Sequence, residues 1–276
     1  MIGQQHLLYT IDQLLSKDVF PHFVIITGSV GSGRKTLARY IGNAFGNVAE
    51  IDVSVDSIRN MIDNSYKIVD KSVFIIPDAD NMSLQAKNAL LKVTEEPPND
   101  AYFIMTLEDQ YNTLQTIRSR GTIFTLENYS KDELMEFINE ALSPTIADDV
   151  DENWKLKILK IAQTPGEIKE LVKFDVDEFY KFVELVIDNI ADSQLANTFK
   201  LADKLSLNKD DEGYNLKLFF RAFTPICLQR MSGIDAPRYA TGVSITSSAL
   251  RDIGINGISK PMLVDNWILE MRKAWS

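Results

Sequence analysis

The chain has 276 residues, of which 45% are hydrophobic and 25% charged, as is typical of a soluble globular protein with two or three compact domains. Its formal net charge of −10 at pH 7 argues against a dedicated nucleic-acid binder, which usually carries a basic face. The single cysteine, Cys227, excludes an intrachain disulfide and a multi-cysteine zinc site, and no apolar run is long enough to span a membrane. We therefore expect a cytoplasmic protein without a metal centre.

The first half of the chain alternates predicted helices and strands. Strands are expected at 23–27, 50–53, 72–76, 102–106 and 122–126, and helices at 7–15, 34–45, 56–63, 83–95 and 111–118. Asp56 is the expected N-cap of the third helix. The run 72–76 is apolar throughout, as expected of a strand buried on both faces. This alternation predicts an α/β domain with a parallel sheet and helices on both sides.

A glycine-rich loop follows the first predicted strand and opens a helix, which is the layout of a P-loop. The loop contains three glycines, Gly28, Gly31 and Gly33. A P-loop places Lys after the last glycine and then a hydroxyl that holds Mg²⁺, but here Arg34 and Lys35 occupy these positions. Lys35 and Thr36 form the functional pair only if the loop bulges, because one residue turns a helical side chain by about 100°. Because Arg34 keeps a positive charge in the expected place, binding of ATP or ADP stays possible. The other departures lead us to expect that this binding is weak or absent.

An acidic motif ends the apolar run 72–76. Asp78 stands at the Walker B position, where a carboxylate binds Mg²⁺ through water. Hydrolytic proteins of this type usually have Glu next, to activate the attacking water, whereas this chain has Ala79, which can take no proton. Asp80 is two positions further on and is expected to point elsewhere. Thr106 ends the next strand and is a candidate contact for a γ-phosphate, with a core-facing orientation equally compatible.

The most specific motif is the segment 88–98 (NALLKVTEEPP), followed downstream by 116–120 (TIRSR). With the opening residues 2–4 (IGQ) and the segment 164–166 (TPG), it resembles the clamp-loader branch of the AAA+ proteins. The likeness is greatest to the delta-prime type of bacterial DNA polymerase III and covers at least residues 1–174. It implies an AAA+ nucleotide-binding-type domain at 1–127, a small helical lid at 128–174 and a helical collar at 175–276.

The same resemblance implies a role for Arg120. Where the family has Ser-Arg-Cys, this chain has Ser119-Arg120-Gly121, and the family's arginine acts in trans on the γ-phosphate of a neighbouring ATPase subunit. Taken alone, an arginine at a helix end is most simply a surface residue, but the surrounding motif favours an arginine finger. In the lid, hydrolytic members usually have an arginine where this chain has Gly166.

After residue 126 only helices are predicted. They are expected at 131–142, 154–162, 166–174, 178–192, 194–205, 214–231, 244–252 and 261–275. The segment 143–152 is expected to be a polar, acidic loop, and 234–242 a turn-rich one. This all-helical half suits the collar by position and class.

Three functions are compatible with these residues. The favoured one is a non-hydrolysing, delta-prime-like clamp-loader subunit that requires no cofactor and lends Arg120 to a neighbour. It implies gamma/tau-like ATPase subunits and a delta-like subunit in a ring, with the sliding clamp and primer–template DNA met through the assembled complex, and no membrane. The alternative is an active AAA+ motor, which needs Lys35-Thr36 as the P-loop pair and another carboxylate, such as Asp80, as the base. The third is an interaction module outside replication.

Overall fold

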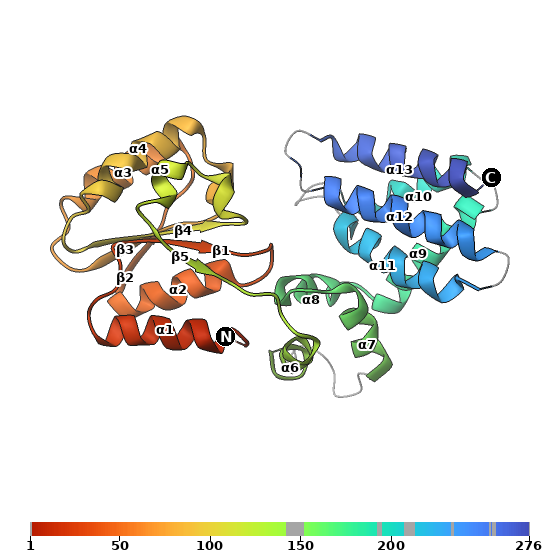
Figure 1. Ribbon diagram of the computed structural model, residues 1–276, viewed down its shortest axis with the longest axis horizontal. Helices are drawn as coiled ribbons and strands as arrows, with labels where there is room; N and C mark the ends of the chain where they lie inside the picture. Colours follow the sequence, from red (N-terminus) through yellow and green to blue (C-terminus); the bar gives the residue numbers. More distant parts are fainter. Residues whose placement is uncertain are drawn as a thin grey trace. The chain divides into compact units, whose positions relative to one another are not determined.

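The computed structural model describes residues 2–141, 152–191, 195–206, 213–232, 235–253, 255 and 258–275. They form two compact units, which Figure 1 draws in the colours of the sequence. The first unit holds the described residues up to 141 and Gln163–Gly166, and the second holds the rest. The expected acidic loop at 143–152 lies, except for its last residue, outside the described residues. The residues predicted to form a lid are divided between the two units, and the three-domain division stays a prediction.

The first unit is built on a five-stranded parallel sheet with strand order β2-β3-β4-β1-β5. Its strands are β1 Phe23–Thr27, β2 Asn47–Glu50, β3 Ser72–Ile76, β4 Ala101–Leu107 and β5 Thr122–Thr125. The predicted α/β class and parallel sheet are thereby confirmed. The strand predicted at 50–53 is wrong in position, because the register pairs Val48 with Val73 and places β2 three residues earlier.

Helices cover both faces of the sheet, because alternate residues of a strand point to opposite sides (Figure 1). On one face lie α1 Gln5–Ser16 and α2 Arg34–Phe45. There Val24 and Ile26 of β1 pack in one buried cluster with Leu37 of α2. The apolar faces of both helices thus follow directly from the helical spacing in the sequence.

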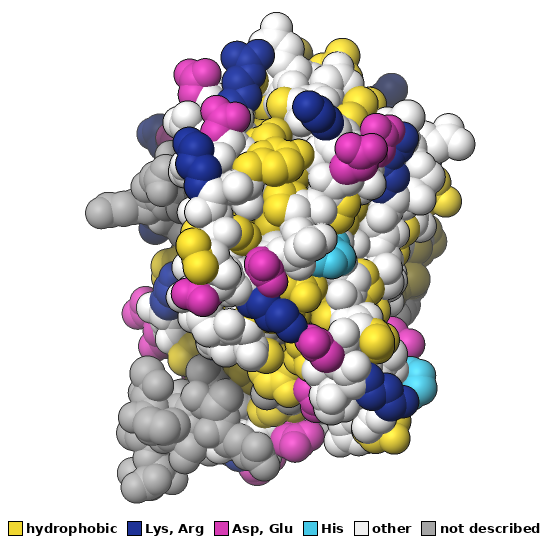
Figure 2. All heavy atoms as spheres, turned by 90° about the vertical axis from the view of Figure 1, so that its left-hand side faces the viewer, with side chains coloured by type: hydrophobic (Ala, Val, Ile, Leu, Met, Phe, Trp, Pro, Cys, Tyr) yellow, Lys and Arg dark blue, Asp and Glu magenta, His cyan; other side chains and the backbone are white. Residues whose placement is uncertain are grey.

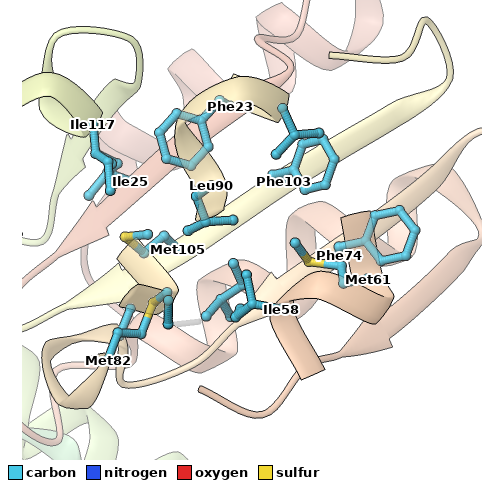
Figure 3. Close-up of a cluster of buried hydrophobic side chains, with 14 of the residues drawn as sticks. Phe23, Ile25, Ile58, Met61, Phe74, Met82, Leu90, Phe103, Met105 and Ile117 are labelled. Carbon is cyan, nitrogen blue, oxygen red and sulfur yellow. The ribbon is translucent and has the colours of Figure 1, made fainter. Parts of the chain in front are cut away.

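The opposite face carries a second buried cluster, shown in Figure 3. It is covered by α3 Val55–Ser65, α4 Leu84–Glu95 and α5 Gln115–Arg118. Phe23 and Ile25 of β1 and Phe103 of β4 meet Leu90 of α4 and Ile117 of α5. Burying these side chains between sheet and helices supplies the main driving force for folding this unit. The sheet is therefore fixed from both sides.

The start of α3 differs from the prediction. Ser54, and not Asp56, is its N-cap, since the Ser54 hydroxyl accepts a hydrogen bond from the Ser57 N–H at 3.2 Å. Asp56 instead lies in the first turn, where a negative charge favours the positive end of the helix dipole.

The single helix predicted at 111–118 is also wrong. A 3₁₀ turn, η2 Gln110–Asn112, begins there because the Asp109 carboxylate accepts a hydrogen bond from the Tyr111 N–H at 2.9 Å. Thr113 and Leu114 are then extended, and only afterwards does the short α5 begin. Another 3₁₀ turn, η1 Ala79–Asn81, follows β3.

The remaining elements are nearly all helical. They are α6 Lys131–Ala141, α7 Glu152–Ile161, α8 Pro165–Leu171, α9 Val176–Ala191, α10 Leu195–Ala202, α11 Leu216–Arg230, α12 Ala236–Asp252 and α13 Lys260–Trp275. The core of the second unit is aromatic: Trp267 lies 5.1–5.6 Å, between ring centroids, from Phe219, Phe220 and Phe223. Its indole N–H donates to the Thr246 hydroxyl at 3.0 Å, so the buried polar group is satisfied.

Two expectations for this half are wrong. The segment expected to be turn-rich, 234–242, contains the start of α12, because Pro237 lies in the first turn of the helix, where its missing N–H is tolerated. Two short strands, β6 Leu205–Ser206 and β7 Tyr214–Asn215, pair in parallel where only helices were expected. Strands of two residues leave no periodic pattern in a sequence.

The surface of the first unit carries charges of both signs. Figure 2 shows Lys and Arg side chains interspersed with Asp and Glu, with hydrophobic side chains between them. Over the described residues of this face there is no continuous basic band of the kind that follows a nucleic-acid backbone. In the described part of the chain, no helix has the length and apolar character needed to cross a bilayer.

Candidate functional site

The carboxyl ends of three neighbouring strands bring most of the predicted site residues together. In the sheet β4 lies between β1 and β3, so the loop after β1, the acidic turn after β3 and the end of β4 meet at one edge. The glycine loop then leads into α2, whose N-cap is Gly33 in a left-handed conformation with φ 100°. Gly28 and Gly31 also have positive φ angles, at 155° and 82°. The backbone geometry of a P-loop region is therefore present.

Two basic side chains at the start of α2 contact the carboxylate of Asp78, the predicted Walker B residue. Lys35 Nζ lies 2.7 Å from Asp78 Oδ2, and Arg34 Nη2 lies 3.8 Å from Asp78 Oδ1. Arg34 is only 7% exposed, and its Nη1 lies 3.8 Å from Asp80 Oδ2. Thr36, by contrast, lies exposed on α2. The charge of Asp78 is thus balanced from within the chain.

Asp78 is further fixed through its backbone. It has a left-handed conformation, with φ 49° and ψ 44°, which is uncommon for a residue with a side chain. Its N–H donates to the hydroxyl of Thr106 at 3.0 Å. Thr106 is fully buried, so its hydroxyl joins the ends of two adjacent strands.

The two residues after Asp78, Ala79 and Asp80, are both held by the surrounding structure. Ala79 is fully buried in the cluster beneath α4, so a carboxylate at this position would enter an apolar core. Asp80 accepts hydrogen bonds from the Glu108 N–H at 2.9 Å and from the Asn112 side-chain amide at 2.8 Å. Asp80 therefore holds the loop that follows β4.

The outer side of the glycine loop is covered by the segment 164–166. The Gly166 N–H donates to the Gly31 carbonyl at 2.9 Å, and the Thr164 hydroxyl donates to the Val30 carbonyl at 3.3 Å. A Cβ atom at position 166 would lie 2.5 Å from Gly31 Cα. The absence of a side chain at Gly166 is what allows this backbone contact.

Tyr129 also contacts the loop and was missed by sequence reasoning. Its hydroxyl donates to the Ser32 carbonyl at 2.7 Å, and burial raises the pKa of Tyr129 above its usual value. A lone tyrosine in a connecting segment carries no pattern that could have revealed this contact.

These contacts fit a bound Mg²⁺–nucleotide poorly. A magnesium ion needs near-octahedral oxygen ligands, and Asp78 already has the Lys35 ammonium at 2.7 Å. The backbone of Gly166 lies against the loop that would surround the phosphates. In the part of the chain that the structure describes, no cluster of three or more His, Cys, Asp or Glu side chains is arranged to hold a metal ion.

Arg120 does not lie with the predicted site residues around the glycine loop and Asp78. It lies just before β5, whose first residue, Thr122, pairs with Val24, while Thr125 pairs with Thr27 beside the glycine loop. Arg120 therefore lies at the amino edge of the parallel sheet, whereas the loop lies at the carboxyl edge. A strand of four residues separates these edges by about 13 Å. This position excludes direct action of Arg120 on the chain's own loop.

The chain matches proteins of bacterial DNA replication. Residues 46–130 match the family model described as DNA polymerase III, delta subunit. The chain is 28% identical over 174 residues to DNA polymerase III subunit gamma of Buchnera aphidicola subsp. Schizaphis graminum, and 26% identical over 172 residues to subunit tau of Bacillus subtilis. Over these segments the chain is similar to subunits of DNA polymerase III. Each alignment covers 51% of the chain but only 48% and 31% of those relatives, so it spans about half of their length or less.

Solved structures with a similar fold include two proteins of Thermotoga maritima. A DNA polymerase III gamma subunit-related protein of Thermotoga maritima has a TM-score of 0.50 at 17% identity, covering 96% of this chain and 99% of that one. The RuvB Holliday junction branch migration motor of the same organism has a TM-score of 0.55 at 17% identity, covering 98% and 88%. At these identities the likeness supports the AAA+ fold, with a helical region after the α/β domain.

The segment around Arg120 departs at one position from the clamp-loader motif that it resembles, and the packing at that position accounts for the difference. Gly121 stands where the family has cysteine. A Cβ atom there would lie 2.9 Å from the Ile25 side chain and 3.0 Å from the Phe23 ring. These two core residues fill the space that a larger side chain would need.

Proposed function

We propose that the chain is a non-hydrolysing, delta-prime-like subunit of a cytoplasmic DNA polymerase III sliding-clamp loader that supplies Arg120 to a neighbouring ATPase subunit. The observation that supports the proposal is the contact of Lys35 Nζ with Asp78 Oδ2 at 2.7 Å, because a protein cation there competes with Mg²⁺ for the carboxylate that a hydrolytic site would use. The burial of Ala79 supports it, because the position of the usual base is inside the core. The chain itself then requires no nucleotide, and ATP or ADP binds weakly or not at all.

Arg120 would act on the neighbour's phosphate by charge and geometry. A guanidinium presents five N–H donors in a rigid fork that matches phosphate oxygens. Placed against a γ-phosphate, it stabilises the charge that develops on the equatorial oxygens in the transition state. The position of Arg120 at the sheet edge opposite the chain's own loop suits action between subunits.

The partners follow from this role. Gamma/tau-like ATPase subunits and a delta-like subunit would complete a ring, in which residues 175–276 serve as the collar. The sliding clamp and primer–template DNA would be met through the assembled complex.

The proposal is tested with the purified chain and with a loader reconstituted from gamma/tau- and delta-type subunits of the same genome. We expect no ATP turnover by the chain alone. In the complex, Arg120→Ala and Arg120→Lys should each lower the clamp- and DNA-stimulated ATPase rate by at least about tenfold, since an arginine finger contributes a large part of catalysis.

Arg118→Lys is the matched control for this experiment. Arg118 lies two residues away, with its guanidinium 4.5 Å from the centre of the Tyr111 ring, and its replacement should leave the rate within about twofold. An unchanged rate with Arg120→Ala would exclude the finger.

An active motor subunit is the second candidate. It is favoured by the curated relatives, which are named gamma and tau. It requires Lys35 to leave Asp78 and Gly166 to move away from Gly31. Robust ATP turnover by the unmodified chain, measured without partner subunits, would support this candidate and overturn the first.

A further inference from the structure

Arg120 is held in place by an acidic residue of the motif 88–98. Its Nη2 donates to Glu95 Oε1, and its Nη1 donates to the Thr116 carbonyl at 2.5 Å. We propose that Glu95 is a positioning residue for Arg120, which fixes the guanidinium so that its remaining N–H groups are presented to the phosphate of a neighbouring subunit. This inference rests on the proposed function, in which Arg120 acts in trans.

Glu95 is itself fixed by the helix that carries it. It is the last residue of α4, whose Leu90 and Val93 are fully buried in the core. Pro97 and Pro98 follow after one further residue, Glu96, and prevent the helix from continuing. The negative end of a helix dipole adds to the attraction of a carboxylate for a cation at this place. The backbone that carries the Glu95 carboxylate therefore has a fixed position relative to the sheet.

The backbone at Arg120 is equally fixed. Its N–H donates to the carbonyl of Ile117 at 3.1 Å, and Ile117 is fully buried in the same core cluster as Leu90. Gly121 packs closely on Phe23 and Ile25. Both partners of the ion pair are thus attached through their backbones to one core, and the freedom that remains lies in the two side chains.

The pair is suited to orientation more than to stability. Arg120 is 30% exposed and Glu95 52% exposed, and ion pairs this accessible contribute little to folding. Two of the five guanidinium N–H donors are used by Glu95 and Thr116, which leaves three for a phosphate. Holding a flexible side chain in its active geometry removes part of the entropy lost on binding.

The test uses the reconstituted loader and measures its clamp- and DNA-stimulated ATPase. We expect Glu95→Ala to lower kcat by about three- to tenfold, with the KM for ATP within about twofold and assembly unchanged, because orientation is lost without loss of substrate binding. Glu95→Gln keeps an acceptor oxygen, so its kcat should lie between that of Glu95→Ala and that of the unmodified loader. Glu96→Ala, which removes the adjacent exposed carboxylate, is the control and should stay within about twofold of the unmodified loader.

A double mutant separates positioning from other effects. In an Arg120→Ala background, Glu95→Ala should cause no further loss, because its effect passes through Arg120. A Glu95→Ala loader that is unchanged or faster, while Arg120→Ala is slow, would overturn the inference and leave the proposed function standing. An Arg120→Ala loader with full activity would overturn both.

Discussion

Single residues at the carboxyl edge of the sheet distinguish this site from the usual P-loop and Walker B pattern. The exchange that places Lys35 where a hydroxyl is expected is visible in the sequence. Its consequence, a contact of 2.7 Å with Asp78, depends on the two residues meeting across β4. Likewise Ala79 is identified from the motif, but its complete burial is a property of the packed core.

At this scale we predict that restoring the missing glutamate does not restore activity. Ala79→Glu should lower the free energy of unfolding by about 3 kcal/mol or more, because an unpaired carboxylate would enter an apolar core. The variant should also show no ATP turnover. Urea unfolding followed by far-UV circular dichroism measures the first effect, and an ATPase assay the second.

Gln85→Glu is the control for added charge, since Gln85 lies exposed on the neighbouring helix α4. Its free energy of unfolding should change by no more than about 0.5 kcal/mol. A stable Ala79→Glu protein that hydrolyses ATP would contradict the prediction.

At the scale of the elements, the start of α8 contacts the glycine loop through the backbone of Gly166. Gly166 is its second residue and lies against the backbone of Gly31, without an intervening side chain. The motif 164–166 is readable in the sequence, but nothing local indicates which segment it contacts.

We predict that replacing Gly166 by alanine lowers the stability of the protein, which is the opposite of the usual effect in a helix. In most helices Gly→Ala stabilises by about 0.5–1 kcal/mol. Here Gly166→Ala should instead destabilise by about 1–3 kcal/mol, because its Cβ would overlap with Gly31. Urea unfolding gives the free energy, and faster amide hydrogen exchange at 28–33 would locate the effect in the loop. A gain in stability would show that the contact is absent in solution.

The molecule as a whole contains two units, each with a core of its own. The first has aliphatic and aromatic side chains on both faces of the sheet, and the second has the aromatic cluster around Trp267. All three tryptophans, Trp154, Trp267 and Trp275, lie in the second unit. Tryptophan fluorescence therefore reports that unit alone, whereas circular dichroism reports both.

At this scale we predict that the two units unfold in separate transitions. Phe103→Ala should destabilise the first unit by about 3–5 kcal/mol and shift part of the circular dichroism transition in urea, with the fluorescence midpoint unchanged. Phe219→Ala, in the second unit, should shift the fluorescence midpoint instead. Equal shifts of both signals with Phe103→Ala would indicate one cooperative transition.

The sequence by itself determined the parallel α/β domain, the glycine loop and the motif around Arg120. These features depend on apolar runs, helical spacing and short motifs, which are local along the chain. The start of α12 and the short strands β6 and β7 were not predicted from the sequence, because turn-forming residues and two-residue strands give weak local signals.

Only the tertiary structure decided which side chains contact one another at the candidate site and around Arg120. Glu95 and Arg120 are 25 residues apart, and their pairing follows from α4 and α5 packing on one core. The contact of Lys35 with Asp78 follows from the strand order, and that of Gly166 with Gly31 from the return of a distant segment to the loop. Residue types set which interactions are available, but strand order and core packing bring distant side chains within reach, and neither is encoded in any local pattern.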